Sequence, residues 1–392
     1  MNPSRVNVKH DLYLSKMIPF NKPFLTGHET EYILNAVNSM KISGDGQYSK
    51  KCHQFFEKKY NFRKTFLTTS CTDALEMAAI LINIQPGDEV IVPTFTFVST
   101  VNAFVLRGAK IVFIDSMKDN PNMDANLIED LITSKTKAIV PVHYAGVACN
   151  MKQIMEVANK HGLYVVEDAA QAIDSYFIHS DGKKQPLGSF GHLATFSFHE
   201  TKNIVSGEGG LLVVNDESMI ERAEIIREKG TNRSKFFRGE VDKYNWIDIG
   251  SSFLPSDIIA AFLFAQLEKM DEIQKNRISI WNAYQKSLLP IAEEKGFTLP
   301  NVPAYATNNG HMYYLLCDTE AHRSFLIDEL KKKNINAVFH YLSLSDSPYF
   351  KDKNEGKHFP NATFFEKHLV RLPFYYQLNT QIVTDEIKNI TK

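Results

Sequence analysis

Uniformly apolar runs alternate with amphipathic segments from about residue 65 to residue 215, and this alternation limits the fold more than any other feature. In chain order, the runs are TFLTTS, EVIVPTFTF, AKIVFID, KAIVPVHY, LYVVEDAA, LATFSFH and GGLLVVND. Strands that are apolar on both faces are typical of a largely parallel sheet with helices on either side. We therefore predict an α/β fold for this part of the chain.

The segments between these runs have the apolar spacing of helices. They are CTDALEMAAILIN, with Thr72 or Asp73 as its cap, VSTVNAFVLRG, NLIEDLITSKT and MKQIMEVANKHG. ESMIERAEIIREKG follows as an amphipathic helix that Gly230 should end. A longer helical stretch is expected from about Pro255 to Glu294, and Pro290 is able to interrupt it.

The pattern changes after about residue 231. NRSKFFRGEVDKYNWIDIGSS is polar, aromatic and loop-like, and it is too long for an idle connection. After about Leu299, the strand-like HMYYLLCD and NAVFHYL mix with the helix-like HRSFLIDELKKKN and NATFFEKHLV. We expect residues 17–255 to form a large domain, and residues 256–392 a long helix and a small C-terminal α+β lobe.

Composition excludes several classes of function. The formal net charge is −1, which provides no strong field for nucleic acid or an anionic membrane. Four widely spaced cysteines and an N-terminus without an apolar stretch favour a reducing cytoplasm. No apolar run is long enough to span a bilayer, and no histidine pair has a defensible metal-ligand spacing. We predict a cytoplasmic protein without a metal.

Polar and aromatic residues gather where the predicted strands end. Ligands of open parallel sheets bind beyond the carboxyl ends of the strands, so these side chains should converge on one crevice. They are Ser70, Cys71, Thr72, Phe95, Phe97, His143, Tyr144, Asp168, Gln171, Ser197, His199 and Lys202.

Two of these residues form a chemical pair. Asp168 directly follows LYVVE, where a carboxylate is costly unless it caps a turn or meets a positive group such as a protonated ring nitrogen. Lys202 lies in FSFHETKN, either as a solvated loop lysine or as a desolvated amine that attacks aldehydes. An amine and a carboxylate in this order are the two protein groups that pyridoxal phosphate chemistry requires.

The same cofactor would need a phosphate site and an aromatic face. The start of CTDALEMAA provides backbone N–H groups and hydroxyls, and Ser197 can add another hydroxyl, although a helix cap that binds nothing is common. Phe97 or Phe95 could stack on the flat ring, or either could be an ordinary core residue.

Several long motifs are similar to those of one family. PGDEVIVPTFTFVSTVNAFVLRGAKIVFID, VEDAAQAID, ATFSFHETKNIVSGEGG and REKGTNRS resemble the DegT/DnrJ/EryC1/StrS sugar-nucleotide aminotransferases. The resemblance runs from about Met17 to near the C-terminus, so residues 1–16 are an extension outside it. It implies the type I, aspartate aminotransferase-like fold and pyridoxal 5'-phosphate as cofactor.

The resemblance also implies roles for individual residues. Lys202 matches the lysine that bonds to the cofactor aldehyde, and Asp168 matches the partner of the pyridine nitrogen. Gln171 matches the residue at the ring hydroxyl, and Phe97 the aromatic that stacks on the ring. The phosphate site is matched by Ser197, Cys71 and Thr72.

One motif departs from the family. Many members have GyNyR, whose asparagine reaches the phosphate in the neighbouring subunit of a homodimer. This chain has GSSFL, with Ser252 at the asparagine position and Leu254 at the arginine position. Ser252 can donate one hydrogen bond there, with less reach. We read the change as a trait of a subgroup.

Substrate contacts are open to two interpretations. Lys229, Arg233, Arg238 and Tyr244 could hold the nucleotide, or they could be solvated loop residues. His143, His199 and His340 could contact sugar or phosphate, or they could be structural.

The resemblance implies transfer of an amino group from L-glutamate to C-4 of dTDP-4-keto-6-deoxy-D-glucose. The product would be dTDP-4-amino-4,6-dideoxy-D-galactose, made for surface polysaccharides such as O-antigen and enterobacterial common antigen. Related dehydratases have histidine in place of the lysine, so Lys202 favours transamination. The alternatives are the gluco-configured product, transamination at C-3, and a non-catalytic binding protein on the same fold. A nicotinamide oxidoreductase is disfavoured because no G-x-G-x-x-G follows a strand.

Overall fold

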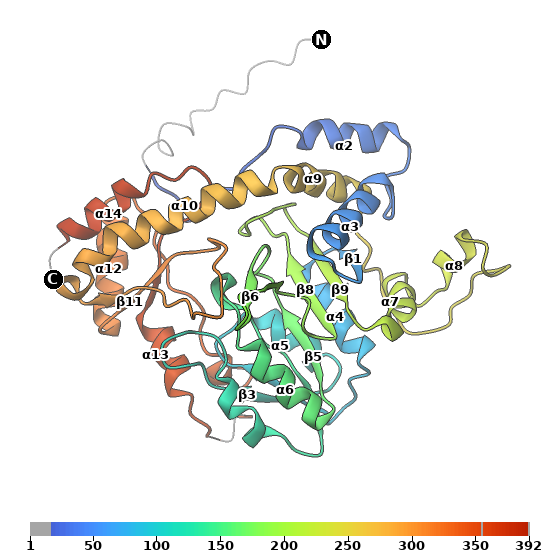
Figure 1. The fold of residues 1–392 in the computed structure, drawn as a ribbon, viewed down its shortest axis with the longest axis horizontal. Helices are drawn as coiled ribbons and strands as arrows, with labels where there is room; N and C mark the ends of the chain where they lie inside the picture. The colour runs from blue at the N-terminus through green and yellow to red at the C-terminus, as the bar shows by residue number, and fades with distance from the viewer. Residues whose placement is uncertain (1–16, 354–355, 391–392) are drawn as a thin grey trace, which may run out of the picture.

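A seven-stranded sheet lies at the centre of the computed structural model, which describes residues 17–353 and 356–390 (Figure 1). The predicted extension, residues 1–16, lies outside the described residues. From one edge to the other, the strands are β1 (Lys64–Thr68), β9 (Gly210–Val214), β8 (Leu193–Ser197), β5 (Tyr164–Asp168), β4 (Thr136–Ile139), β2 (Glu89–Pro93) and β3 (Lys110–Ile114). Only β9 pairs antiparallel with its neighbours, so the sheet is mostly parallel, as predicted.

Both faces of this sheet are buried, which explains why its strands are apolar throughout. On β9, Leu211 and Val213 belong to one hydrophobic cluster, and Leu212 and Val214 belong to the other. Successive strand residues point to opposite faces, so the two clusters lie on opposite sides of the sheet. The helices that contact its strands are α3 (Gln47–Tyr60), α4 (Cys71–Leu81), α5 (Val98–Val105), α6 (Met151–His161) and α7 (Ile220–Arg227). Outside them, α9 (Asp257–Glu268) packs on α3, and α2 (Glu29–Asn38) packs on α9.

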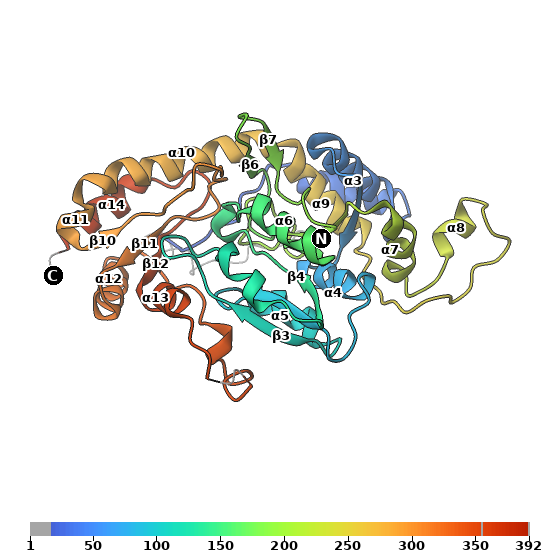
Figure 2. The same ribbon diagram turned by 60° about the horizontal axis from the view of Figure 1, so that its bottom comes forward.

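The C-terminal lobe has its own core around a three-stranded antiparallel sheet. Its strands are β10 (Phe297–Thr298), β11 (Tyr314–Cys317) and β12 (Leu369–Arg371). Its helices are α10 (Met270–Leu288), α11 (Ala292–Lys295), α12 (Glu320–Lys332), α13 (Pro360–His368) and α14 (Thr380–Asn389). Figure 2 shows this lobe at the opposite end of the molecule from α8 (Arg233–Phe237), which stands out on an arm.

Smaller elements connect these parts. A hairpin of β6 (Tyr176–Ile178) and β7 (Lys184–Pro186) pairs antiparallel. The short 3-10 helices are Ala125–Leu127, Glu129–Leu131, Tyr144–Gly146, Glu217–Met219, Leu289–Ile291 and Leu344–Asp346. Two of these replace the helix predicted for NLIEDLITSKT, and the predicted strand NAVFHYL contributes only an isolated bridge between Val338 and Arg371.

Helix boundaries differ from prediction at two places. Ser70 caps α4 instead of Thr72 or Asp73, because its backbone is extended and its hydroxyl accepts the N–H of Asp73. The long helical stretch breaks first at Lys269, whose backbone leaves the helical region, and again at the turn containing Pro290.

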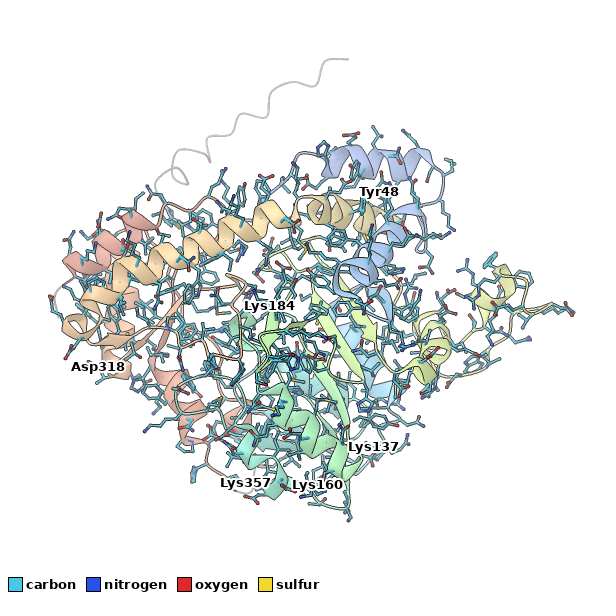
Figure 3. All side chains as sticks on the ribbon, in the orientation of Figure 1. Tyr48, Lys137, Lys160, Lys184, Asp318 and Lys357 are labelled. Carbon is cyan, nitrogen blue, oxygen red and sulfur yellow. The ribbon has the colours of Figure 1, made fainter. Side chains whose placement is uncertain are left out.

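Two segments lie with a different lobe from the one that sequence order suggests. The carboxylate of Asp257, at the start of α9, accepts hydrogen bonds from Ser49 and from the backbone of Tyr48 on α3. Of these residues, Tyr48 is labelled in Figure 3. Residues 257–268 therefore pack with the large domain. Near the N-terminus, Ile18 pairs with Ile335, and the carbonyl of Phe20 accepts the N–H of Phe374, so this segment packs on the C-terminal lobe.

Two kinds of feature are absent from the described residues. No helix there has the length and apolar character needed to cross a membrane. Within residues 17–353 and 356–390, no cluster of three or more histidine, cysteine, aspartate or glutamate side chains could hold a metal ion.

Candidate active site

A cavity of about 650 Å³ lies at the carboxyl ends of the parallel strands, where the large domain meets the C-terminal lobe. Ten of the predicted site residues line it: Ser70, Cys71, Thr72, Phe97, Asp168, Gln171, Ser197, His199, Lys202 and His340. The C-terminal lobe adds His311, Met312, Tyr341, Arg371 and Phe374, and the N-terminal segment adds Phe20 and Asn21.

Lys202 lies in a tight turn beyond β8. Its backbone N–H donates to the carbonyl of His199 at 2.9 Å, which closes the turn and turns the side chain toward the cavity. Burial lowers the pKa of the Lys202 amine, because desolvation penalises the charged form. The nearby Asp168 opposes this shift without cancelling it. A lowered pKa favours the neutral amine that attack on an aldehyde and proton removal both require.

Asp168 ends β5 and is held by two donors. The hydroxyl of Thr100 donates to one carboxylate oxygen at 2.7 Å, and the backbone N–H of Ala170 donates to the other at 3.1 Å. These bonds fix the orientation of a buried carboxylate that can accept a further proton donor from the cavity.

Gln171 is held from both sides of its amide. Its oxygen accepts the N–H of Ala145 at 2.7 Å, and its nitrogen donates to the hydroxyl of Tyr341 at 3.0 Å. Tyr341 comes from the C-terminal lobe, so this bond joins the two lobes across the cavity wall.

The start of α4 forms a polar cradle. The hydroxyl of Thr72 donates to that of Ser99 at 2.8 Å, and Ser197 lines the same cavity. A side-chain carbon at Gly210 would lie 2.3 Å from the carbonyl oxygen of Ser70, so only glycine allows β9 to approach the helix start this closely. Backbone N–H groups and hydroxyls at a helix start are a site for an anion.

The two candidate aromatic residues have different environments. Phe97 is 54% exposed and lines the cavity at the start of α5. Phe95 is 1% exposed and packs against Tyr144, Tyr341 and Phe365 in the core. Only Phe97 is therefore placed to stack on a ligand ring.

These groups fit pyridoxal phosphate. One cavity contains a desolvated amine, a fixed carboxylate, an anion cradle at a helix start and an accessible aromatic face. They match the aldehyde, ring nitrogen, phosphate and ring face of the cofactor.

Of the three predicted histidines, two line the cavity and one does not. His143 is fully buried and is not among the residues that line the cavity. Its two ring nitrogens bond to the carboxylate of Glu167 and to the N–H of Cys149. His199 lines the cavity and bonds to the hydroxyl of Thr201, and His340 bonds to the hydroxyl of Tyr144 at 2.6 Å. Burial holds the pKa of His340 well below its usual value, so the ring is neutral.

The predicted nucleotide contacts and Ser252 do not line the cavity of their own chain. Arg233 pairs with Glu228 at 3.2 Å, and Arg238 pairs with Glu224 at 3.0 Å. Both arginines lie on the arm that carries α8. The remaining three residues, Lys229, Tyr244 and Ser252, lie on this arm or next to it. Contact with a bound nucleotide would require the arm to meet the cavity of another copy.

Among the residues that line the cavity without having been predicted are Thr100, Tyr341 and Arg371. Thr100 lies inside a helix and shows its role only through its bond to Asp168. Arg371 and Tyr341 come from the C-terminal lobe, and their one signal is a polar group between apolar neighbours in LVRLPF and FHYL. That signal is too common to single out a site residue.

Known proteins resemble this chain along almost its whole length. The model of the DegT/DnrJ/EryC1/StrS aminotransferase family matches residues 24–391. The spore coat polysaccharide biosynthesis protein SpsC of Bacillus subtilis is 31% identical, over 95% of this chain and 96% of that protein. A GDP-perosamine synthase of Escherichia coli O157:H7 is 32% identical, over 94% and 96%.

A solved structure agrees. The PLP form of a putative sugar aminotransferase from Streptococcus pneumoniae superposes with a TM-score of 0.85 at 26% identity, covering 95% of this chain and 97% of that one. The predictions of the family, the type I fold, an enzyme and pyridoxal phosphate are confirmed. The chain belongs to the DegT/DnrJ/EryC1/StrS aminotransferase family and uses pyridoxal phosphate as its cofactor.

Proposed function

We propose that this enzyme transfers an amino group from L-glutamate to C-4 of dTDP-4-keto-6-deoxy-D-glucose and forms dTDP-4-amino-4,6-dideoxy-D-galactose. The observation that carries transamination is the desolvated amine of Lys202 in the same cavity as the fixed carboxylate of Asp168. A sugar substrate is supported by the names of relatives, which include a GDP-perosamine synthase and sugar aminotransferases. The motifs of this chain favour the dTDP-linked C-4 ketosugar.

Each residue has a distinct task in this proposal. Lys202 would hold the cofactor at its aldehyde and, as a free amine, would move the proton at the donor α-carbon. Asp168 would hold the protonated ring nitrogen, and Phe97 would support the ring face. When bound, the cofactor would supply the electron sink that transamination needs. The second half-reaction uses the same groups in reverse, so ping-pong kinetics are expected.

We also propose a homodimer in which the partner subunit completes the site. Ser252 is exposed and does not line the cavity of its own chain. The arm beside it exposes Phe237, Trp246 and Ile247. Clustered exposed apolar side chains are typical of a protein contact surface. In this arrangement Ser252, Lys229, Arg233, Arg238 and Tyr244 reach the partner's cavity.

The relatives favour a second candidate for the nucleotide. Because a GDP-perosamine synthase is 32% identical to this chain, a GDP-linked ketosugar competes with the dTDP-linked one. Transamination at C-3 and the gluco-configured product also compete, since they depend on how the pyranose lies over the cofactor ring.

One experiment tests these possibilities together. The enzyme is incubated with L-glutamate and either dTDP-4-keto-6-deoxyglucose or a GDP-linked 4-ketosugar, and the product is identified by NMR. The coupling constants around the aminated carbon report its position and configuration. An axial C-4 amine on a dTDP sugar is expected, and turnover of the GDP sugar alone would refute the proposal.

A further inference from the structure

His311 is a buried cavity residue whose two ring nitrogens have different environments. It lines the cavity from the segment that precedes β11, and only 8% of its surface is exposed. Its Nδ1 lies 2.8 Å from the side-chain oxygen of Asn203. Its Nε2 bonds to none of the described residues, and it is not one of their solvent-inaccessible polar atoms without a partner. Nε2 is therefore open to the cavity.

The hydrogen bonds of Asn203 fix the tautomer of this ring. The amide nitrogen of Asn203 donates to the backbone carbonyl of Asn309 at 2.9 Å and to the side-chain oxygen of Gln274 at 3.0 Å. A backbone carbonyl only accepts, so the opposite orientation of the amide would place two oxygens against each other. The amide oxygen therefore faces His311 and accepts the proton on Nδ1. In the neutral ring this leaves Nε2 as a hydrogen-bond acceptor.

The surroundings of His311 keep the ring neutral. Burial lowers the pKa of His311 well below its usual value, and the positive charges of Lys202, Arg277 and Arg371 lower it further. Nε2 therefore has no proton at neutral pH. An acceptor of this kind binds a hydroxyl or amine donor, and it cannot bind a carboxylate, because a carboxylate only accepts.

The backbone around His311 is held by both lobes. Its N–H donates to the side-chain oxygen of Asn309 at 3.0 Å, and its carbonyl accepts the guanidinium of Arg277 on α10 at 2.8 Å. Asn309 in turn donates to the carbonyls of Gln171 and Ile173 in the large domain, each at 2.8 Å. An acceptor fixed in this way is pre-organised for a ligand.

Two other acceptors in the cavity are already occupied. Both carboxylate oxygens of Asp168 accept hydrogen bonds from within the chain, and the amide oxygen of Gln171 accepts a backbone N–H. Asn203 directly follows Lys202 in the chain, so its partner His311 lies beside the turn that carries the reacting amine. His311 therefore offers an open acceptor close to the reaction.

We propose that His311 determines substrate specificity by accepting a hydrogen bond from the C-3 hydroxyl of the ketosugar, an inference that rests on the proposed function. The reacting carbon, C-4, has two neighbours in the pyranose ring. C-5 carries the methyl group, and C-3 carries a hydroxyl, which is therefore the sugar donor closest to the reaction. A buried acceptor discriminates against an analogue without the matching hydroxyl, because the acceptor is then left unpaired. L-Glutamate has no hydroxyl, so its half-reaction should not depend on this bond.

The test compares two ketosugars in the second half-reaction. Aminated enzyme is mixed with dTDP-4-keto-6-deoxyglucose or with its 3-deoxy analogue, dTDP-4-keto-3,6-dideoxyglucose. Stopped-flow absorbance gives the apparent second-order rate constant for each sugar. Wild type should prefer the sugar with the 3-hydroxyl by about 10- to 100-fold, the range for a buried acceptor that is left without its donor.

The variant His311→Asn separates the contact from the fold. The amide nitrogen of asparagine can replace Nδ1 and keep the bond to Asn203, but the side chain is too short to replace Nε2. The rate constants for the two sugars should then agree within about threefold, and the glutamate half-reaction should stay within about threefold of wild type. The matched control His161→Asn, at the end of α6 and outside the cavity lining, should keep the preference. Cofactor absorbance and the melting temperature report whether each variant is folded.

Three results would overturn the inference. The first is equal rate constants of wild type for the two sugars, a result that holds whether or not His311→Asn folds. The second is a folded His311→Asn that keeps the full preference for the 3-hydroxyl. The third is a variant that slows only the glutamate half-reaction, which would assign the acceptor to the amino donor.

Failure of the proposed function gives a different result. If wild type aminates neither dTDP sugar, the proposed substrate is refuted. The same comparison is then made with a GDP-linked 4-ketosugar and its 3-deoxy analogue, because the hydroxyl beside the ketone does not depend on the nucleotide. A preference for the 3-hydroxyl that His311→Asn removes would support the role of His311 there, and equal rate constants would refute it.

Discussion

Replacement of Glu167 by glutamine should destabilise the fold strongly, although it changes only one atom. Glu167 lies next to Asp168 on β5 and is fully buried. One carboxylate oxygen accepts the N–H groups of Phe190 and Gly191 at 2.8 and 2.7 Å. The other accepts the N–H of Gly188 at 2.9 Å and bonds to Nε2 of His143 at 3.0 Å.

The magnitude follows from these four donors. His143 accepts the N–H of Cys149 on Nδ1, so its proton is on Nε2 and all four groups donate. Either orientation of a glutamine amide places its NH2 against two of them. Two hydrogen bonds to a charged group are then lost, each worth about 1.5–3 kcal/mol. The expected loss is about 3–6 kcal/mol.

Urea unfolding followed by fluorescence, together with the melting temperature, measures this loss. Glu156→Gln, an exposed glutamate on α6, is the matched control and should stay within about 0.5 kcal/mol of wild type. Folded Glu167→Gln should retain turnover, because Glu167 does not line the cavity. A destabilisation below about 1 kcal/mol would refute the reasoning.

Four further predictions concern the site, acid stability and assembly. Lys202→Ala should lose turnover and the visible absorbance of the covalently bound cofactor in a spectrum of the purified protein; substantial activity would contradict its role. Asp168→Asn should bind the cofactor but slow the glutamate half-reaction by orders of magnitude in stopped flow, and a near-normal rate would remove its role at the ring nitrogen. Burial lowers the pKa of His53, whose ring accepts the N–H of Leu67, from its usual value to about 3. Its contribution to stability is present above pH ~6.5 and is lost as the pH falls toward 3, because only the unfolded chain binds the proton. Between pH 7 and pH 5, His53→Gln should therefore lose about 2 kcal/mol less unfolding free energy than wild type, and equal losses would contradict this. Sedimentation should show a dimer, and an active monomer would exclude a partner role for Ser252.

The large domain was predictable because its signals are local. The strands are buried on both faces, so their residues are apolar at successive positions. This local pattern is sufficient to predict the strands of a covered sheet. The predicted helix over NLIEDLITSKT shows the limit, since its spacing fits a helix but the chain forms two short 3-10 turns. The division of the long helix between the lobes was not predictable, because it depends on contacts of Asp257 with Ser49 of α3, 208 residues away in the chain.

The sequence by itself determined the α/β class, the position of Lys202 and Asp168 at strand ends, and the cofactor that they require. These features depend on residues close together in the chain, where periodicity and residue chemistry are sufficient. Only the tertiary structure decided that His143 is buried and hydrogen-bonds to the carboxylate of Glu167. The same holds for Arg371, whose guanidinium lies over the ring of Phe20. Those roles depend on which polar groups find partners when distant segments pack, and no local pattern contains that information.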